Sequence, residues 1–158
     1  MFSIQDNDIF SGIPEATLCP VNCSGRFHYG LISHYMQFYP AIRDAYLRSH
    51  ELNLLQPGKL EVFTLARPNK NTKHILMLPV QTAINDRTSL FLIENSCVQI
   101  LQCIEQYQLN SLWIPAIGCE NGGMDFNRLS DTLYRHFCQV NNCDIVLLKP
   151  HQAESLLL

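Results

Sequence analysis

Two short glycine-containing segments have the residue pattern best suited to binding a ligand. "NCSGRFHYG" covers residues 22–30 and "GCENGG" covers residues 118–123; each follows an apolar run that predicts a strand and precedes a pattern that predicts a helix. Glycines permit sharp turns and let a ligand approach the main chain closely. Free N–H groups at the positive end of a helix suit a phosphate. Two such loops lying side by side would suit a diphosphate.

Four polar side chains in or beside these loops are candidates for chemistry. Asn22 ends a predicted buried strand, where a polar group needs a partner. His28 has a side chain that can exchange protons near neutral pH, or it simply covers the pocket as a loop histidine. Asp125 either orients a water molecule or caps the following helix. Glu120 either orients a water molecule or is a solvated loop carboxylate.

The cysteines number seven and include no CxxC pair, so the sequence indicates neither a disulfide framework nor a common zinc pattern. We therefore expect no metal and no cofactor. Cys97 falls on the apolar stripe of a predicted helix and Cys143 opens a predicted strand, so both are expected to pack in the core. Cys23 and Cys119 lie in the loops, where they could contact a ligand. A nucleophilic role would need a nearby base, which the sequence does not specify.

Alternating strands and helices must position the two loops. The opening "MFSI" is a possible additional strand, and the apolar runs that predict strands cover residues 16–21, 60–65, 74–80, 111–117 and 143–148. Apolar spacings of three and four predict helices from Leu90 over about 18 residues and from Phe126 onward. A helical region over 31–51 should be split by Pro40. The segments 56–60 and 66–73 predict turns.

This order of elements predicts an α/β fold: a three-layer α/β/α arrangement with a central mixed sheet. In open sheets of this kind, ligands bind outside the carboxyl ends of the strands, which is where both loops begin. We expect residues 1–158 to form a single domain, because a chain of this length has room for one core.

Composition narrows the functional classes. The chain is 47% apolar and 16% charged with a formal charge of -3, and its Lys and Arg residues form no run. An extended surface for duplex nucleic acid is therefore not expected. No basic leader and no apolar run of about 18 residues is present, so we expect no membrane association and a cytoplasmic location. We also expect a monomer.

The order of these segments resembles the macrodomain family, the ADP-ribose-binding fold. "NDIF" (7–10) is similar to an early Gly-Asp-Ile motif of the family, "PVNCSG" (20–25) to its strand-to-loop motif, and "IPAIGCENGGMDF" (114–126) to its second phosphate loop. The pattern is most similar to the branch that contains terminal ADP-ribosyl glycohydrolases and DNA ADP-ribosyl glycohydrolase antitoxins. The resemblance covers about residues 5–148.

The resemblance implies a role for each matching position. Asp8 and Ile9 would recognise the adenine, Asn22 would lie near the distal ribose, and the two loops would line opposite sides of the diphosphate. The implied ligand-binding residues are Asp8, Ile9, Asn22, Cys23, Gly25, Gly30, Leu31, Ile32, Ala116, Ile117, Gly118, Cys119, Glu120, Asn121, Gly122, Gly123, Met124 and Phe126.

Three positions depart from the pattern of this branch. His28 and Tyr29 replace a glycine and a lysine in the first loop, which would narrow the distal-ribose pocket. Gln81 stands where glycohydrolases of the branch have a lysine, and an amide can neither form an adduct with the sugar nor titrate. Gly122 stands where terminal ADP-ribosyl glycohydrolases have an acid. The catalytic candidates are thus Asn22, His28, Gln81 and Asp125.

Several functions remain open from the sequence. The first is hydrolysis of an ADP-ribosyl linkage on protein, nucleic acid or a small ester by positioning a water, and a phosphatase acting on ADP-ribose 1''-phosphate is a variant of it. The second is a binding module for ADP-ribose or a related nucleotide signal. The third is a partner-binding domain without a working pocket. The expected partner is ADP-ribose or an ADP-ribosylated protein or nucleic acid.

Overall fold

A computed structural model of the chain describes residues 1–83, 86–119 and 122–150, and its strands form one mixed six-stranded sheet in the order β1-β6-β5-β2-β4-β3. All neighbouring strands are parallel except β3, which pairs with β4 in the antiparallel sense. The strands are β1 (Phe2–Gln5), β2 (Ala16–Asn22), β3 (Glu61–Asn69), β4 (Thr72–Gln81), β5 (Ser111–Ile114) and β6 (Asp144–Leu148).

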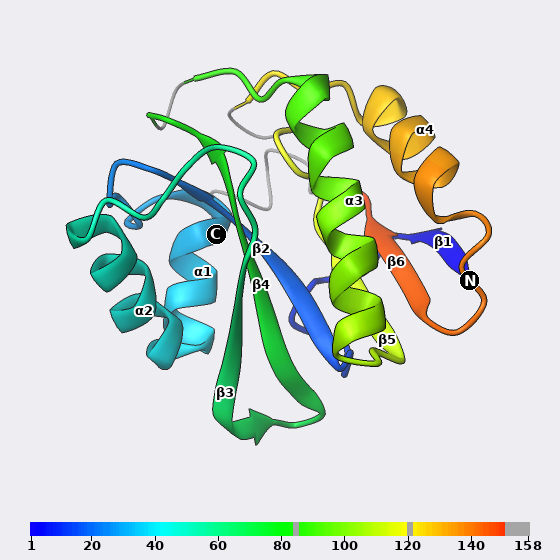
Figure 1. Cartoon of the computed structure of the whole chain (residues 1–158), viewed down its shortest axis with the longest axis horizontal. Helices are drawn as coiled ribbons and strands as arrows, with labels where there is room; N and C mark the ends of the chain where they lie inside the picture. Colours follow the sequence, from blue (N-terminus) through cyan, green and yellow to red (C-terminus); the bar gives the residue numbers. More distant parts are fainter. Residues whose placement is uncertain (84–85, 120–121, 151–158) are drawn as a thin grey trace.

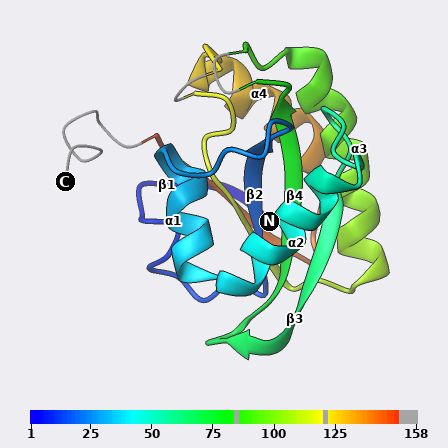
Figure 2. The same cartoon turned by 90° about the vertical axis from the view of Figure 1, so that its left-hand side faces the viewer.

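Helices cover both faces of this sheet, which makes the predicted three layers. The helices are α1 (Gly30–Phe38), α2 (Pro40–Glu51), α3 (Leu90–Gln106) and α4 (Phe126–Phe137). Figure 1 shows α1 and α2 on one side of the sheet and α3 and α4 on the other, and Figure 2 shows α1 and α2 in front of β2 and β4. Two apolar cores result, one including Tyr35 and Tyr46 and the other including Ile100 and Phe137, all fully buried.

Local sequence signals explain where the helices begin. Pro40 occupies the first turn of α2, where its missing N–H costs nothing, so the region 31–51 is split as predicted. The Ser89 hydroxyl accepts a hydrogen bond from the Leu92 N–H at 3.1 Å and caps α3. The Asp125 carboxylate accepts one from the Asn127 N–H at 2.9 Å and caps α4. The capping interpretation of Asp125 is therefore confirmed.

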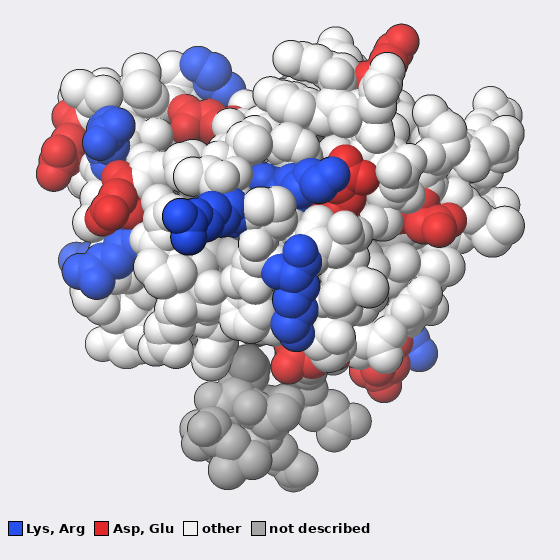
Figure 3. Space-filling view, turned by 90° about the horizontal axis from the view of Figure 1, so that it is seen from below, with Lys and Arg blue, Asp and Glu red and all other residues white. Residues whose placement is uncertain are grey.

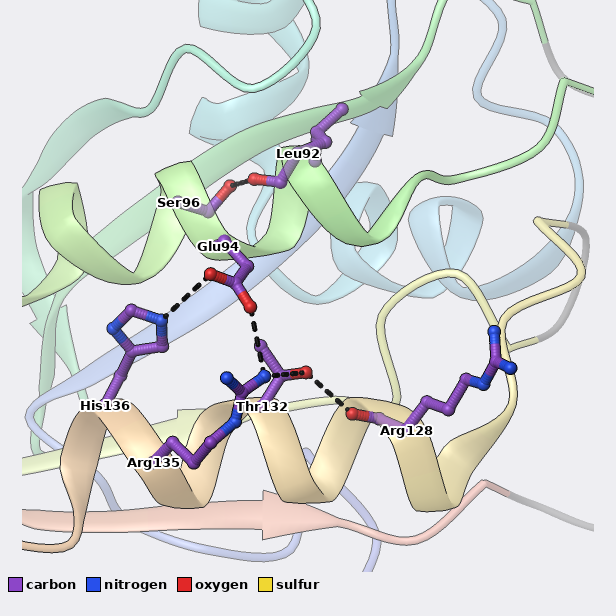
Figure 4. A network of polar contacts seen from close by, with 7 residues as sticks. All are labelled: Leu92, Glu94, Ser96, Arg128, Thr132, Arg135 and His136. Carbon is purple, nitrogen blue, oxygen red and sulfur yellow. Dashed lines mark hydrogen bonds and ion pairs between the residues drawn. The ribbon is translucent and has the colours of Figure 1, made fainter.

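A polar network joins α3 and α4 on the outside of the sheet (Figure 4). The Glu94 carboxylate lies 3.0 Å from the Arg135 guanidinium and 3.7 Å from Nε2 of His136. Arg135 also donates to the Thr132 hydroxyl at 3.3 Å. These groups are partly exposed to solvent, so the network contributes little to the free energy of unfolding. Beneath it, the buried side chains of the two helices carry the packing.

Two expectations about element boundaries are wrong. The segment 66–73 is largely strand: β3 continues to Asn69 and β4 begins at Thr72, with Lys70 at φ 55° in the tight turn between them. Pro68 is tolerated because β3 is an edge strand and its pairing is irregular between Thr64 and Asn69. Strand β5 ends at Ile114, three residues earlier than expected, directly before Pro115.

Candidate ligand-binding cleft

A cleft runs along the edge where the parallel strands end. Its empty volume, which includes open solvent at the mouth, is about 830 Å³. It is lined by the last residues of β2, β4 and β6 and by the segment that follows β5. Figure 1 shows the loops that follow β2, β4 and β5 along the upper edge of the molecule.

The cleft is elongated because it crosses several strands. One end is lined by Ile9 and Lys149 and the other by Val80 and Gln81. Strands β6 and β4 are three strand spacings apart, about 14 Å. The ends of β2 and β5 lie between them. A long, thin ligand would therefore lie across the strand ends, with its middle near the two glycine-containing loops.

The first loop, residues 22–30, is organised by the side chain of Asn22. Its Nδ2 donates to the Arg26 carbonyl at 2.8 Å. Its Oδ1 accepts from the Ser24 N–H at 3.0 Å and from the Ser24 hydroxyl at 2.6 Å. Asn22 lines the cleft and is 4% exposed. The partner that its buried amide was expected to need is thus supplied by the loop itself.

Helix α2 holds the first loop from behind. The Tyr46 hydroxyl donates to the Asn22 carbonyl at 2.7 Å, and burial raises the pKa of Tyr46, so the hydroxyl remains a proton donor at neutral pH. His50 Nδ1 lies 3.1 Å from the Cys23 carbonyl. A Cβ on Gly25 would lie 2.7 Å from the His50 ring, and Gly25 has φ +81°, so both space and backbone require glycine there.

The second loop, residues 118–123, is held by the segment before α3. The Thr88 N–H donates to the Gly122 carbonyl at 3.0 Å, and the Thr88 hydroxyl donates to the Val80 carbonyl at 3.3 Å. A Cβ on Gly118 would lie 2.7 Å from the Thr88 Cβ, and Gly118 has φ +75°. The loop therefore packs with its backbone against Thr88, and Gly118 and Gly122 line the cleft.

Gln81 lines the cleft at the end of β4 and is 8% exposed. The side-chain Nε2 of Gln81 donates to the main-chain carbonyl of Asp86 at 2.6 Å. The main-chain carbonyl of Gln81 accepts a hydrogen bond from the Cys23 N–H at 2.9 Å. Gln81 thus ties the first loop to the segment after β4. This arrangement assigns Gln81 a positioning role that the sequence did not suggest.

Only part of the expected site lines the cleft. The expected residues found there are Ile9, Asn22, Leu31, Ile32, Gln81, Ala116, Gly118 and Gly122. The expected residues not found among its lining are Asp8, Cys23, Gly25, His28, Gly30, Ile117, Cys119, Gly123, Met124, Asp125 and Phe126. Glu120 and Asn121 lie outside the described residues.

Local contacts account for several of the residues outside the lining. Asp8 accepts a hydrogen bond from the Phe10 N–H at 2.9 Å, which closes a turn. His28 is exposed, with its ring centroid 4.5 Å from that of Phe27. The Asp125 carboxylate is exposed and is engaged in capping. Phe126 packs against the core beneath the second loop. Of the four catalytic candidates, Asn22 and Gln81 line the cleft, whereas His28 and Asp125 do not. A direct contact with the substrate therefore has the least support for His28 and Asp125.

Sequence reasoning missed several residues of the cleft: Asn7, Pro20, Val21, Val80, Pro115, Leu148, Lys149 and Pro150. Most of them end a parallel strand or directly follow one. The rule that ligands bind outside the carboxyl ends of strands would have selected these positions if applied to every strand. Tyr29, which was expected to narrow the pocket, does line the cleft and is 72% exposed.

Burial explains why most thiols are unsuited to nucleophilic chemistry. It raises the pKa of Cys23 and Cys19, that of Cys97 to about 12 and that of Cys143 to about 11. Because the thiolate is the nucleophile, the buried Cys19, Cys97 and Cys143 are unsuited to nucleophilic attack at neutral pH. The expected packing roles of Cys97 and Cys143 are confirmed by their burial. Among the described residues, no group of three or more His, Cys, Asp or Glu side chains could hold a metal ion.

These pKa values predict a labelling order. Cys138 is exposed, whereas Cys143 is buried and its raised pKa leaves about 100-fold less thiolate than the ordinary value would. Timed iodoacetamide labelling at pH 8, read by mass spectrometry, should modify Cys138 well before Cys97 and Cys143. In denaturant the three should react at similar rates. Equal rates in the folded protein would contradict the burial described here.

Comparison with solved structures identifies the fold as that of macrodomains. The macrodomain of Mycobacterium tuberculosis DarG matches with a TM-score of 0.89 and 24% identity, covering 96% of this chain and 99% of that chain. Thermosipho africanus DarTG in complex with ADP-ribose matches with a TM-score of 0.84 and 18% identity, covering 98% of this chain and 44% of that chain. No family model matches the sequence.

Two curated proteins are similar to the chain in sequence. DNA ADP-ribosyl glycohydrolases of Mycobacterium tuberculosis and Mycobacterium bovis are 24% identical to the chain over 150 residues, which is 95% of this chain. The chain spans 42% of the length of these relatives. Within the described ranges, no helix has the length and apolarity needed to cross a membrane.

Proposed function

We propose that the cleft binds an ADP-ribosyl group and that the protein removes this group from a modified macromolecule by hydrolysis. The observation that carries the proposal is the elongated cleft across the strand ends, with glycine-containing loops beside its middle. Its shape matches a diphosphate joining two nucleoside-like ends. A related fold is known in complex with ADP-ribose, and the curated relatives are DNA ADP-ribosyl glycohydrolases.

The two ends of the cleft suit different parts of this ligand. The diphosphate would lie between the N-terminus of α1 and the second loop, where backbone N–H groups favour an anion. The adenine would lie toward Ile9 and Lys149. The distal ribose would lie toward Asn22 and Gln81, so that its anomeric carbon faces the first loop.

The hydrolytic step would rest on positioning. A water oxygen attacks the anomeric carbon, the bond from that carbon to the macromolecule breaks, and the proton of the water passes to the leaving group. Among the described residues lining the cleft, only Tyr29 and Lys149 have ionisable side chains. Lys149 follows β6, about 14 Å across the sheet from Gln81, so it does not substitute for a lysine at that position. Orientation of the water against the bound diphosphate would therefore provide the acceleration.

A second function, binding without turnover, is favoured by one observation. Gln81 occupies the position expected for a lysine, and its amide is bonded to the Asp86 carbonyl. Such a side chain neither forms an adduct with the sugar nor exchanges a proton. A domain of this kind would capture ADP-ribose or an ADP-ribosylated partner.

Two measurements test these functions. Calorimetry with ADP-ribose should show saturable binding under both, and no heat at high micromolar concentration would overturn both. Incubation with ADP-ribosylated DNA and with ADP-ribosylated protein, read as released ADP-ribose, separates them. Release from either substrate supports hydrolysis; binding without release supports the second function. Gln81→Lys then shows whether a lysine alone restores turnover.

Tyr46 and Tyr35 form a matched pair for testing the support of the first loop. Both are fully buried, and each hydroxyl donates to a β2 carbonyl, that of Tyr46 to Asn22 at 2.7 Å and that of Tyr35 to Leu18 at 2.6 Å. Replacing either with Phe should lower the free energy of unfolding by about 1–2 kcal/mol. Only Tyr46→Phe should also weaken ADP-ribose binding, by about tenfold. Urea denaturation and calorimetry check this; equal binding losses would contradict it.

A further inference from the structure

Hydrolysis of the proposed kind needs a proton at the leaving group, and few side chains of the cleft can supply one. Among the described residues that line the cleft, the ionisable side chains are those of Tyr29 and Lys149. The scarcity is particular to the cleft, because the face in Figure 3 shows acidic and basic side chains interspersed among uncharged ones. Lys149 follows β6, at the end of the cleft opposite Gln81. Tyr29 is therefore the ionisable lining residue that belongs to the first loop.

The start of α1 holds Tyr29 against the cleft. Its backbone is extended, with φ -130° and ψ 153°, at the N-cap position of the helix. Leu31 and Ile32, in the first turn of α1, line the cleft as well, so the start of this helix forms part of one wall. The side chain of Tyr29 lines the cleft and is 72% exposed, so it is reachable both from the cleft and from solvent.

The Tyr29 hydroxyl is available for a reaction. Within the described ranges, no hydrogen bond or ion pair involves it. The hydroxyls of Tyr35 and Tyr46, in contrast, donate to main-chain carbonyls at 2.6 and 2.7 Å. A tyrosine hydroxyl can donate and accept a hydrogen bond, and tyrosine is among the side chains that act as general acids. The positive end of α1 would stabilise the phenolate that forms when the proton leaves.

The two amide side chains that line this part of the cleft are already engaged. Nδ2 of Asn22 donates to the Arg26 carbonyl, and its Oδ1 accepts from Ser24. Nε2 of Gln81 donates to the Asp86 carbonyl at 2.6 Å. An amide does not exchange a proton near neutral pH. Asn22 and Gln81 therefore shape the cleft and leave the proton transfer to another group.

We propose that Tyr29 is the general acid of the hydrolysis and that its hydroxyl protonates the leaving atom. This inference rests on the proposed function, which directs the anomeric carbon toward the first loop, where Tyr29 lies. The bond from that carbon to the macromolecule breaks, and its electron pair stays on the leaving atom, which takes the Tyr29 proton. The water oxygen bonds to the carbon, and the surplus proton of the water passes to the phenolate. The hydroxyl is restored and one water is consumed.

Tyr29→Phe removes the hydroxyl and keeps the ring. In the intact protein it should lower kcat for release of ADP-ribose from a modified macromolecule by about 100-fold or more, the usual contribution of a general acid. The Kd for ADP-ribose, measured by calorimetry, should stay within about twofold, because the proton is needed only as the bond breaks. The control Tyr134→Phe, at an exposed position on α4 outside the cleft lining, should change neither quantity.

A second substrate with a better leaving group tests the role of the proton directly. ADP-ribose carrying para-nitrophenol at its anomeric carbon releases nitrophenolate, a weakly basic anion that departs without a proton. The contribution of a general acid falls with the basicity of the leaving group, so Tyr29→Phe should lower kcat for this substrate by less than about fivefold. A purely structural role for Tyr29 would reduce the turnover of both substrates alike.

Failure of the proposed function and failure of this inference give different results. If the unmodified protein hydrolyses neither substrate, the proposed hydrolysis is wrong and the role of Tyr29 is excluded with it. If the protein is active and Tyr29→Phe keeps full kcat on the macromolecule, only the inference is wrong. Equal losses on the two substrates, or a matching rise in the Kd for ADP-ribose, would overturn it as well. Turnover of the macromolecule without turnover of the nitrophenyl substrate would also contradict it, since the easier leaving group should react at least as fast.

Discussion

Gly118→Val should weaken ADP-ribose binding by at least about 100-fold while the protein remains folded. A Cβ at this position would lie 2.7 Å from the Thr88 Cβ, and φ is +75°, where a β-branched residue is strained. Thr88 is buried and bonded to the Val80 and Gly122 carbonyls, so it cannot move aside cheaply. The second loop must shift instead, which displaces the backbone groups expected to hold the diphosphate. A 100-fold loss corresponds to about 2.7 kcal/mol.

Gly58→Val is the matched control for this prediction. Gly58 has φ +81°, and its Cβ would approach the Leu92 Cγ at 3.3 Å, so the substitution strains a backbone of the same kind. The turn at Gly58 does not line the cleft. Calorimetry with ADP-ribose should therefore show a large loss for Gly118→Val and little change for Gly58→Val, with comparable losses of stability in urea. Unchanged binding by Gly118→Val would show that the second loop does not contact the diphosphate.

Asn22→Ala should lower the free energy of unfolding by about 2–3 kcal/mol and raise the Kd for ADP-ribose more than tenfold. The substitution removes the acceptor of the Ser24 N–H and hydroxyl and the donor to the Arg26 carbonyl, leaving a partly buried loop without its internal bonds. The loss is larger than for Tyr46→Phe because several partners are orphaned at once. Urea denaturation and calorimetry measure the two effects.

Two further variants show whether Asn22 acts by organising the loop. Asn22→Asp keeps the acceptor for Ser24 but loses the donor to Arg26, so binding should be partly retained. Asn69→Ala removes one amide contact, 3.3 Å from the Phe38 carbonyl at the remote hairpin, and should leave binding intact. If Asn22→Ala is stable and binds normally but loses turnover, Asn22 is a catalytic group and not a positioning residue.

Much of the fold was predictable because its signals are local. Pro40 at the first turn of α2 and Asp125 at the cap of α4 are signals within a few residues of the boundary that they set. The β3–β4 hairpin at Lys70 differs from the prediction, which made the whole segment 66–73, including Pro68, a turn. The place of Pro68 in the strand depends on β3 being at the edge of the sheet, which is a tertiary fact.

The candidate site divides in the same way. By itself, the sequence determined that two glycine-containing loops each join a strand to a helix, because turn chemistry and apolar periodicity are encoded locally. Only the tertiary structure decided that the side chain of Asn22 is hydrogen-bonded within its own loop. It also decided that Tyr46 supports the first loop and Thr88 the second. Lys149 and Gln81, far apart in the sequence, line the same cleft at opposite ends. These relations depend on the strand order β6-β5-β2-β4, which brings together residues far apart in the chain. Strand order is set by packing of the whole sheet against both helical layers, and no short window of sequence contains it.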